Sequence, residues 1–421
     1  MINIQAFSRR NLVHAASNLR KRNPLSILNT EANKAANEIQ NHSFEFGELG
    51  TKKSNDKITY FFTDPKSKLV EAKVNDNLKR SYNVKPNDRT ITVSQIKTLL
   101  SEAGPFFIIK LDIKSFFESI DRSKLIQELS SQMLVSTETQ WLLNKLDQTF
   151  RFKNIQGLPR GLSISTTLSE IALSEFDASI RAMPGVYFYS RYVDDILIFC
   201  FKNEKKIKSD IEKLLKKTRD LYVNVDKSEE YSVQCRCRSS CLCTSGNCRC
   251  RLRCRCKEED GEDTTLDYLG YKFIFKDTPN GKNLKTVDID IADKKIKKMK
   301  TRIARSFQAY RKSGDLLLMQ RRLKFLTGNY PIYRGRSDRG LKGGIYYNYP
   351  MLTQYDGLKD LDKFKRNIAK SMKHPIGRAL RLSLSTEQLD WISNISFVYG
   401  HKKKVFHKLT RNQMYEIKSC F

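Results

Sequence analysis

The stretch Tyr187–Phe201, YFYSRYVDDILIFCF, decides the fold, because it is almost wholly aromatic and β-branched yet carries two adjacent carboxylates at its centre. This composition is typical of β-strands, and a hairpin would place Asp194 and Asp195 at its turn. A buried carboxylate without a partner costs several kcal/mol, whereas a carboxylate bound to a metal ion is neutralised. The residues therefore predict a hairpin whose turn presents two carboxylates to a cation.

A third carboxylate ends another apolar run. Residues 106–112, FFIIKLD, predict a buried strand that ends at Asp112. If this strand lies beside the hairpin, Asp112 and Asp194 meet at one edge of the sheet and could hold two Mg²⁺ ions roughly 3.5–4 Å apart. Oxygen ligands suit Mg²⁺. The alternative is a structural turn without a metal, since an Asp-Asp pair in an apolar segment is a weak signal by itself.

The chain carries a large excess of positive charge. Its 421 residues include 77 Lys and Arg against 46 Asp and Glu, which gives a formal net charge of +31. The basic side chains repel one another in a compact fold unless a polyanion is bound. Nucleic acid is therefore the first partner to expect. A merely soluble basic surface is the alternative. Neither a long apolar run nor a secretory signal is evident, so we expect a cytoplasmic protein without a membrane partner.

Hydrophobic periodicity predicts a mixed α+β fold. Helices are expected over residues 30–39, after the N-cap Asp121, over 161–183 as a loop leading into one long helix, and over 207–221. Strands are expected at residues 57–64, at 106–113, in the hairpin and at 266–275, and residues 89–100 read as a strand-like start that becomes helical. This order predicts a sheet with helices packed on one face.

Four motifs occur in the order expected of a templated polymerase palm: FFIIKLDIKSFFESI, IQGLPRGLSIS, YSRYVDDILIF and LDYLGYKF. Together they resemble reverse transcriptases, with parallels to retron and group II intron enzymes over residues 80–330. The sequence shows no nuclease, RNase H or protease constellation after residue 300, and SIS lacks the Ser-Pro that those two groups commonly have. The segment LPRGLSISTTLSEI and the ending WISNISFVYGHKKKVFHKLTRNQMYEIKSCF look more like bacterial defence-associated and abortive-infection reverse transcriptases. This resemblance implies a right-hand fold with fingers, a palm built on an antiparallel sheet, and a helical thumb.

The resemblance also implies roles for individual residues. Asp112, Asp194 and Asp195 match the catalytic aspartates, and the two Mg²⁺ ions, for which Mn²⁺ could substitute, would be held by these three and Ile113. One ion would activate a 3′-hydroxyl and the other would stabilise the leaving pyrophosphate. Phe117 matches the steric gate that excludes a ribose 2′-hydroxyl. It could instead be a core aromatic, with its neighbour as the gate.

Further residues match nucleotide and primer contacts of the family. Arg160 stands in GLPRG where Gln is usual, and could contact phosphate or be an ordinary surface arginine. The glycines of this motif, Gly157 and Gly161, permit close backbone approach. Other nucleotide contacts are expected from Lys227, which could protonate pyrophosphate, and from Arg89, the preferred residue of the set Arg80, Lys85 and Arg89. The hairpin at Leu269 and Gly270 matches the primer grip.

A cysteine-rich insertion interrupts the polymerase motifs. Its repeat consists of Cys235, Cys237, Cys241 and Cys243, followed at the same spacing by Cys248, Cys250, Cys254 and Cys256. Residues i and i+2 share a face of an extended chain, so each pair can present two thiolates together. Four thiolates in each half match two structural Zn²⁺ sites. The alternatives are an iron–sulfur or copper thiolate cluster, and a redox-active or unstructured segment.

These features define expected domains: a basic N-terminal region (1–80), fingers and palm (81–231), the zinc insertion (232–265), primer-grip-like palm strands (266–290), and a basic thumb with the C-terminal region (291–421). Within the last, residues 329–350 interleave aromatics with Arg and Lys, as single-strand stacking sites do.

The expected activity is RNA-directed DNA synthesis in antiphage defence. Its partners would be deoxynucleotides, a DNA product, an RNA template such as a dedicated non-coding RNA, a second polymerase or effector, and another copy of the chain. The alternatives are untemplated or protein-primed DNA synthesis at the same site, and a non-catalytic RNA-binding scaffold of the maturase type.

Overall fold

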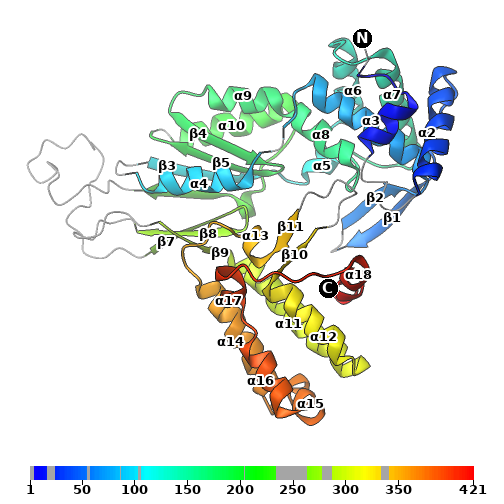
Figure 1. Ribbon diagram of the computed structural model, residues 1–421. Helices are drawn as coiled ribbons and strands as arrows, with labels where there is room; N and C mark the ends of the chain where they lie inside the picture. The colour runs from blue at the N-terminus through cyan, green and yellow to red at the C-terminus, as the bar shows by residue number, and fades with distance from the viewer. Residues whose placement is uncertain are drawn as a thin grey trace, which may run out of the picture. The chain divides into compact units, whose positions relative to one another are not determined.

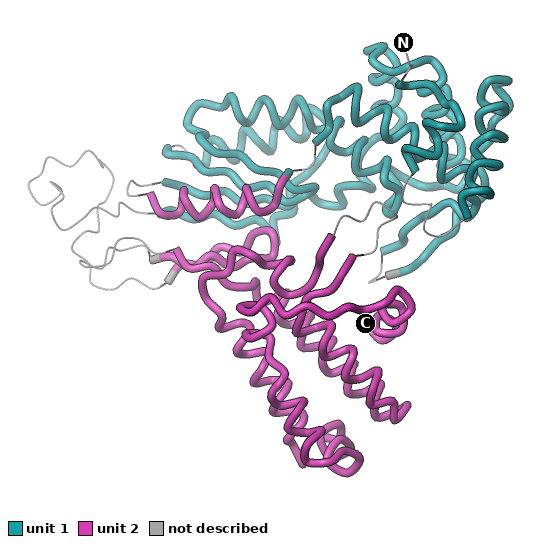
Figure 2. The backbone as a smooth tube through the Cα atoms, viewed as in Figure 1, with its two compact units in different colours: residues 1–87, 105–233 teal, residues 88–104, 234–421 magenta. Residues whose placement is uncertain are grey.

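The computed structural model describes residues 4–16, 24–54, 57–85, 87–102, 106–202, 204–233, 263–276, 287–332 and 341–421. The chain forms two compact units (Figure 2). Unit 1 comprises residues 1–87 and 105–233, and unit 2 comprises residues 88–104 and 234–421. The eight insertion cysteines, Cys235 to Cys256, lie outside the described residues. Among the described helices, none has the length and apolar character needed to cross a membrane.

Unit 1 is built on a four-stranded antiparallel sheet in the order β4-β5-β3-β6 (Figure 1). Its strands are β3 (Phe106–Asp112), β4 (Val186–Tyr192), β5 (Asp195–Cys200) and β6 (Glu229–Val233). Residues 196–200 of β5 are fully buried, which explains the continuous apolar run in that half of the hairpin. The predicted strand over residues 106–113 and the predicted hairpin are both confirmed.

The helices of unit 1 are α1 (Arg9–Ala15), α2 (Leu25–Gln40), α3 (Pro65–Ser81), α5 (Phe116–Ser119), α6 (Arg122–Ser131), α7 (Thr137–Phe152), α8 (Ser163–Ala172), α9 (Ser174–Arg181) and α10 (Glu204–Arg219). A separate hairpin pairs β1 (Leu49–Ser54) with β2 (Lys57–Phe62). Asp121 caps α6 as predicted, since its side chain accepts from the Lys124 backbone nitrogen. Helices α9 and α10 pack against the large sheet.

The single long helix predicted over residues 161–183 is wrong, because α8 and α9 are separated at Leu173. Serine side chains on both sides of this break bond to nearby carbonyls. Ser169 donates to Thr166 and Ser174 donates to Ile171, each at 2.9 Å. Such local bonds compete with the regular helical pattern.

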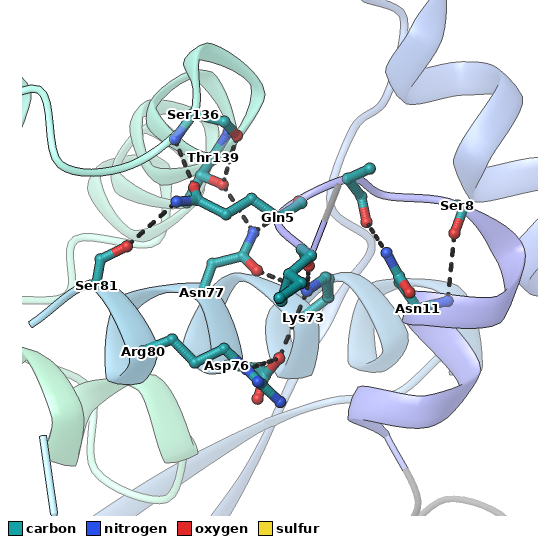
Figure 3. Close-up of polar contacts among 12 residues, drawn as sticks. Gln5, Ser8, Asn11, Lys73, Asp76, Asn77, Arg80, Ser81, Ser136 and Thr139 are labelled. Atoms are coloured by element: carbon teal, nitrogen blue, oxygen red, sulfur yellow. Dashed lines mark hydrogen bonds and ion pairs between the residues drawn. The ribbon is translucent and has the colours of Figure 1, made fainter. Parts of the chain in front are cut away.

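Within unit 1, partly buried polar contacts hold the N-terminal residues against α3 and the start of α7 (Figure 3). Lys73 of α3 donates to the carbonyl of Ile4 at 2.7 Å, and Asn77 donates to the carbonyl of Gln5 at 2.9 Å. Gln5 in turn accepts from the backbone nitrogen of Ser136, the residue that caps α7. The segment before α1 therefore stabilises the packing of α3 near α7.

Unit 2 contains a three-stranded antiparallel sheet formed by β7 (Asp263–Tyr268), β8 (Tyr271–Lys276) and β9 (Asp288–Ile291). Its helices are α4 (Arg89–Leu100), α11 (Asp293–Ser313), α12 (Leu316–Thr327), α13 (Ile345–Asn348), α14 (Asp356–Lys370), α15 (Pro375–Ser383), α16 (Thr386–Asn394), α17 (Phe397–Lys402) and α18 (Arg411–Lys418). A short ladder joins β10 (Asn329–Pro331) to β11 (Lys342–Gly344). Helix α11 packs against α12 and α14.

The strand-like start predicted at residue 89 is wrong, since α4 is helical from Arg89 onward. The Asp88 side chain accepts from the backbone nitrogens of Thr90 and Ile91, and this N-cap outweighs the strand preference of the β-branched residues. The predicted turn of the β7–β8 hairpin is present, with Leu269 and Gly270 at φ 51° and 80°. Two residues at positive φ match the tight turn that suits twisted strands.

Candidate active site

The site begins at the turn between β4 and β5. Val193 has a φ of 62°, which is unusual and costly for a β-branched residue. Arg191, only 3% exposed, donates to the Val193 carbonyl at 3.1 Å and to the Asp177 carboxylate at 2.7 and 2.8 Å. Arg191 therefore ties the strained turn to α9, a role that the sequence did not reveal.

Strand pairing brings the three predicted aspartates together. Asp112 lies opposite Asp195 in the β3–β5 register, and the Ile113 backbone nitrogen donates to the Asp194 carbonyl at 3.1 Å. Asn224 donates through its backbone to the Asp112 carbonyl at 2.7 Å and through its amide to the Asp112 carboxylate at 3.1 Å. These bonds position Asp112 from two sides.

The electrostatics of the turn favour a bound cation. Burial raises the pKa of Asp194, and the nearby Asp112 charge raises it further. The pKa of Asp195 is raised by burial and then by the charges of both other aspartates. Like charges this close disfavour ionisation, so a divalent ion would relieve their repulsion. Lys227, 61% exposed at its side chain, already donates to Asp112 at 3.2 Å.

No group of three or more His, Cys, Asp or Glu side chains within the described ranges forms a ready metal centre. Mg²⁺ is often held by one or two carboxylates together with substrate phosphates and water. The aspartate arrangement fits that kind of open site, which substrate oxygens would complete.

A cavity of about 330 Å³ adjoins the aspartates, entirely within unit 1. Its lining combines carboxylates with basic side chains and consists of Lys57, Asp112, Ile113, Lys114, Ser115, Phe116, Glu118, Arg160, Asp194, Asn224 and Lys227. Positive groups beside a carboxylate pair are suited to a polyphosphate that shares a divalent ion with the carboxylates.

The GLPRG loop is held on both sides by backbone bonds. The Leu158 nitrogen donates to the Phe117 carbonyl and the Tyr60 nitrogen donates to the Arg160 carbonyl, each at 2.7 Å. Gly161 has a φ of 101°, and a Cβ there would lie 2.7 Å from the Tyr60 carbonyl oxygen. The loop therefore approaches β2 so closely that only glycine fits without strain.

Arg160 makes a two-pronged ion pair inside the cavity. Its guanidinium donates to the two carboxylate oxygens of Glu118 at 2.5 and 2.9 Å and lies 5.0 Å from the ring centroid of Phe117. The Glu118 bond is the largest cause that raises the pKa of Arg160. Phe116 is 1% exposed and lines the cavity, whereas Phe117 is half-buried beneath Arg160. The steric-gate role of Phe117 stays a prediction.

Two predicted site regions lie in unit 2. Arg89 donates to the carbonyls of Leu269 at 2.9 Å and Asn348 at 2.7 Å. Its guanidinium also lies over the rings of Tyr271 and Tyr349. Arg89 is thereby bound to the turn of the predicted primer-grip hairpin. Its expected contact with a triphosphate stays a prediction.

Several residues of the cavity were not predicted from the sequence, among them Lys57, Glu118 and Asn224. Glu118 lies within the quoted FFIIKLDIKSFFESI motif, and Asn224 precedes Lys227 by one turn. Lys57 begins β2, far from the aspartates in sequence. Proximity to a motif could have suggested the first two, but no sequence signal indicates Lys57.

Residues 52–273 match the protein family described as reverse transcriptase (RNA-dependent DNA polymerase). The chain belongs to this family. The members of this family are RNA-directed DNA polymerases, a class of nucleotidyltransferase. The mixed sheets and helices agree with a polymerase fold, as the motifs predicted. A search of curated proteins found no match.

The solved structures similar to this reverse transcriptase include two of telomerase. The first is apo telomerase from Candida tropicalis truncated from its C-terminal domain, with 12% identity, a TM-score of 0.37, and coverage of 63% of this chain and 60% of that one. The second is telomerase from Candida tropicalis in complex with a TWJ fragment of telomeric RNA, with 12% identity, a TM-score of 0.38, and coverage of 88% and 63%. This chain thus spans less than two thirds of either telomerase chain.

Proposed function

We propose that this reverse transcriptase copies RNA into DNA at the cavity beside Asp112, Asp194 and Asp195. The observation that carries the proposal is the pairing of β3 with β5, which sets Asp112 opposite Asp195 and bonds Ile113 to Asp194. In the reaction, a primer 3′-oxygen attacks the α-phosphorus of a deoxynucleotide and pyrophosphate leaves.

The chain's own residues would divide this work. Asp112, Asp194, Asp195 and the Ile113 carbonyl would hold two divalent ions, which supply charge stabilisation at the attacking and leaving oxygens. Mg²⁺ is the proposed ion, with Mn²⁺ as a substitute. Lys57, Arg160 and Lys227 line the same cavity and would bind the triphosphate. Gly161 would let the loop approach the nucleotide, and Phe117 would discriminate against ribose.

The wider biological role is also proposed. The polymerase motifs favour a bacterial defence-associated enzyme that copies a dedicated non-coding RNA. The domain boundaries given above and structural zinc in the cysteine insertion belong to the same proposal. Untemplated or protein-primed synthesis would use the same aspartates, and a maturase-like scaffold would use none of them.

The test is to purify the protein with its co-purifying nucleic acid, add Mg²⁺ and labelled deoxynucleotides, and sequence the bound RNA and any DNA. We expect DNA complementary to one enriched RNA, and no DNA from the Asp194→Asn protein. Asp210→Asn is the matched control, because Asp210 is a half-exposed carboxylate of α10. DNA without a matching RNA would favour untemplated synthesis, and bound RNA without DNA would favour the scaffold.

A further inference from the structure

A second cavity lies wholly within unit 2, where the end of α12 meets α16 and α17. Its volume is about 320 Å³, near the lower end of the roughly 300–1,000 Å³ that small-molecule sites occupy. The rings of Trp391, Tyr399 and His407 line it, together with Lys324. The Lys324 ammonium lies 5.8 Å from the Trp391 ring centroid. Flat rings beside a cation match the two parts of a nucleotide, its base and its phosphate.

Two buried side chains of α14 organise the segment that joins α16 to α17. Asp362, 8% exposed, accepts from the Ser396 hydroxyl at 2.6 Å and from the Phe397 backbone nitrogen at 2.9 Å. Lys365, which is fully buried, donates to the carbonyl of Ile392 at 2.7 Å and to that of Ile395. Because these hydrogen bonds already fix the segment, a ligand that contacts it would cause little further loss of conformational entropy.

The opposite wall is held by backbone contacts. The Asn329 nitrogen donates to the Val405 carbonyl at 2.8 Å, and the His407 nitrogen donates to the Asn329 carbonyl at 2.7 Å. A Cβ on Gly328 would lie 2.5 Å from the His407 ring. The imidazole can therefore approach the main chain this closely, while forming part of the cavity wall, only because residue 328 is glycine.

The polar groups of this cavity are neutral or positive. Its lining contains no Asp or Glu among the described residues, and Lys402, Lys403 and Lys404 follow directly at the end of α17, where all three are exposed. Burial and the Lys324 charge lower the pKa of His407, which favours the neutral ring, a form that can donate and accept a hydrogen bond. The Asn394 amide is exposed at the rim. This surface suits an anionic ligand with a flat, hydrogen-bonding ring.

We propose that this cavity binds one unpaired nucleotide of a single-stranded RNA. The base would stack on Trp391 and Tyr399, and the phosphate would lie near Lys324. A base within a duplex is stacked on both faces and cannot enter such a site without leaving its pair. The site is separate from the aspartates and does not depend on polymerisation.

Intrinsic fluorescence provides a direct test, because the chain has two tryptophans, Trp141 and Trp391. In a Trp141→Phe protein the remaining emission comes from the cavity. A short uridine oligoribonucleotide, added without deoxynucleotides or Mg²⁺, should quench this emission, and a duplex RNA of equal length should not. In the same background, Tyr399→Ala should weaken binding of the single strand about tenfold.

Tyr415→Ala is the matched control, since Tyr415 is an 82% exposed tyrosine of α18 in the same unit. It should leave the affinity unchanged. The proposal is overturned if the single strand does not quench Trp391, if the duplex quenches it equally, or if the Tyr399 and Tyr415 variants bind alike. Each outcome is independent of DNA synthesis, so failure here would leave the polymerase assignment untouched.

Discussion

The ion pair between Arg160 and Glu118 should limit the affinity of the polymerase site for deoxynucleotides. The carboxylate occupies both prongs of the guanidinium, which is the geometry that a phosphate would use. A triphosphate that binds Arg160 must displace Glu118. We therefore expect Glu118→Gln to lower the KM for deoxynucleotides, because the neutral amide competes less well for Arg160.

The size of this effect follows from the exposure of the pair. The side chains are 20% and 46% exposed, and exposed pairs contribute about 0.2–1 kcal/mol. The two-pronged geometry places this pair near the upper end of that energy range. Loss of about 1 kcal/mol of competition should lower the KM for deoxynucleotides by up to about fivefold. The kcat should change less, because Glu118 is paired with Arg160 and is not one of the aspartates that would hold the metal ions.

The assay is single-nucleotide incorporation on a primed RNA at varied deoxynucleotide concentration. Glu230→Gln is the control, since Glu230 forms a comparable partly exposed ion pair with Lys208 and does not line the cavity. A rise in KM would refute the reasoning and mean that Glu118 positions Arg160 for substrate. An equal fall in the Glu230 variant would attribute the effect to net charge.

Three further predictions concern the loop, the sugar gate and unit 2. Gly157→Ala should lower the stability of unit 1 by about 1–3 kcal/mol in thermal unfolding, because residue 157 has a φ of 60° and its Cβ would collide with the Phe117 carbonyl. Phe117→Ala should raise ribonucleotide incorporation at nearly native stability. Phe116→Ala should instead lower the unfolding free energy by about 3–5 kcal/mol, because that ring is 1% exposed. If the Phe117 variant and the native protein select equally between deoxyribose and ribose, the gate is contradicted. Burial lowers the pKa of Lys365 from 10.5 to about 8, so between these values the folded state binds fewer protons than the unfolded state. The difference in unfolding free energy between the native protein and Lys365→Met should then rise by at most about 1.4 kcal/mol per pH unit. Denaturant titrations at several pH values measure this difference, and a difference that does not change with pH would exclude the lowered pKa of Lys365.

Much of the fold followed from short-range patterns. The apolar runs of residues 106–112 and 196–200 predicted strands because β3 and β5 are buried on both faces, which leaves a continuous apolar signature. The start of α4 and the break at Leu173 were not predicted. Both involve local hydrogen bonds between side chains and the backbone, accepted by Asp88 and donated by Ser169 and Ser174, which hydrophobic periodicity does not record.

The candidate site was partly predictable for a related reason. Asp112, Asp194 and Asp195 stand out because each interrupts or ends an apolar run. Glu118 and Lys57 interrupt no pattern, so their place in the cavity follows only from the packing of β2 and α5 beside the GLPRG loop. Nothing in the local sequence predicts that Arg160 would be paired with Glu118.

The two parts of the site have different structural origins, and this should make them separable. Backbone pairing between β3 and β5 sets the aspartates, and Arg191 supports their turn from a buried position through Asp177 and the Val193 carbonyl. The cations come from β2, the GLPRG loop and the segment after α10, and they lie at the surface of the cavity. A charge change among the aspartates should therefore remove the chemical step, whereas a change at Arg160 should mainly alter nucleotide affinity. The strained turn at Val193 is stabilised by the buried side chain of Arg191. Substitutions at Arg191 should therefore displace the aspartates and leave the basic side chains of the cavity in place.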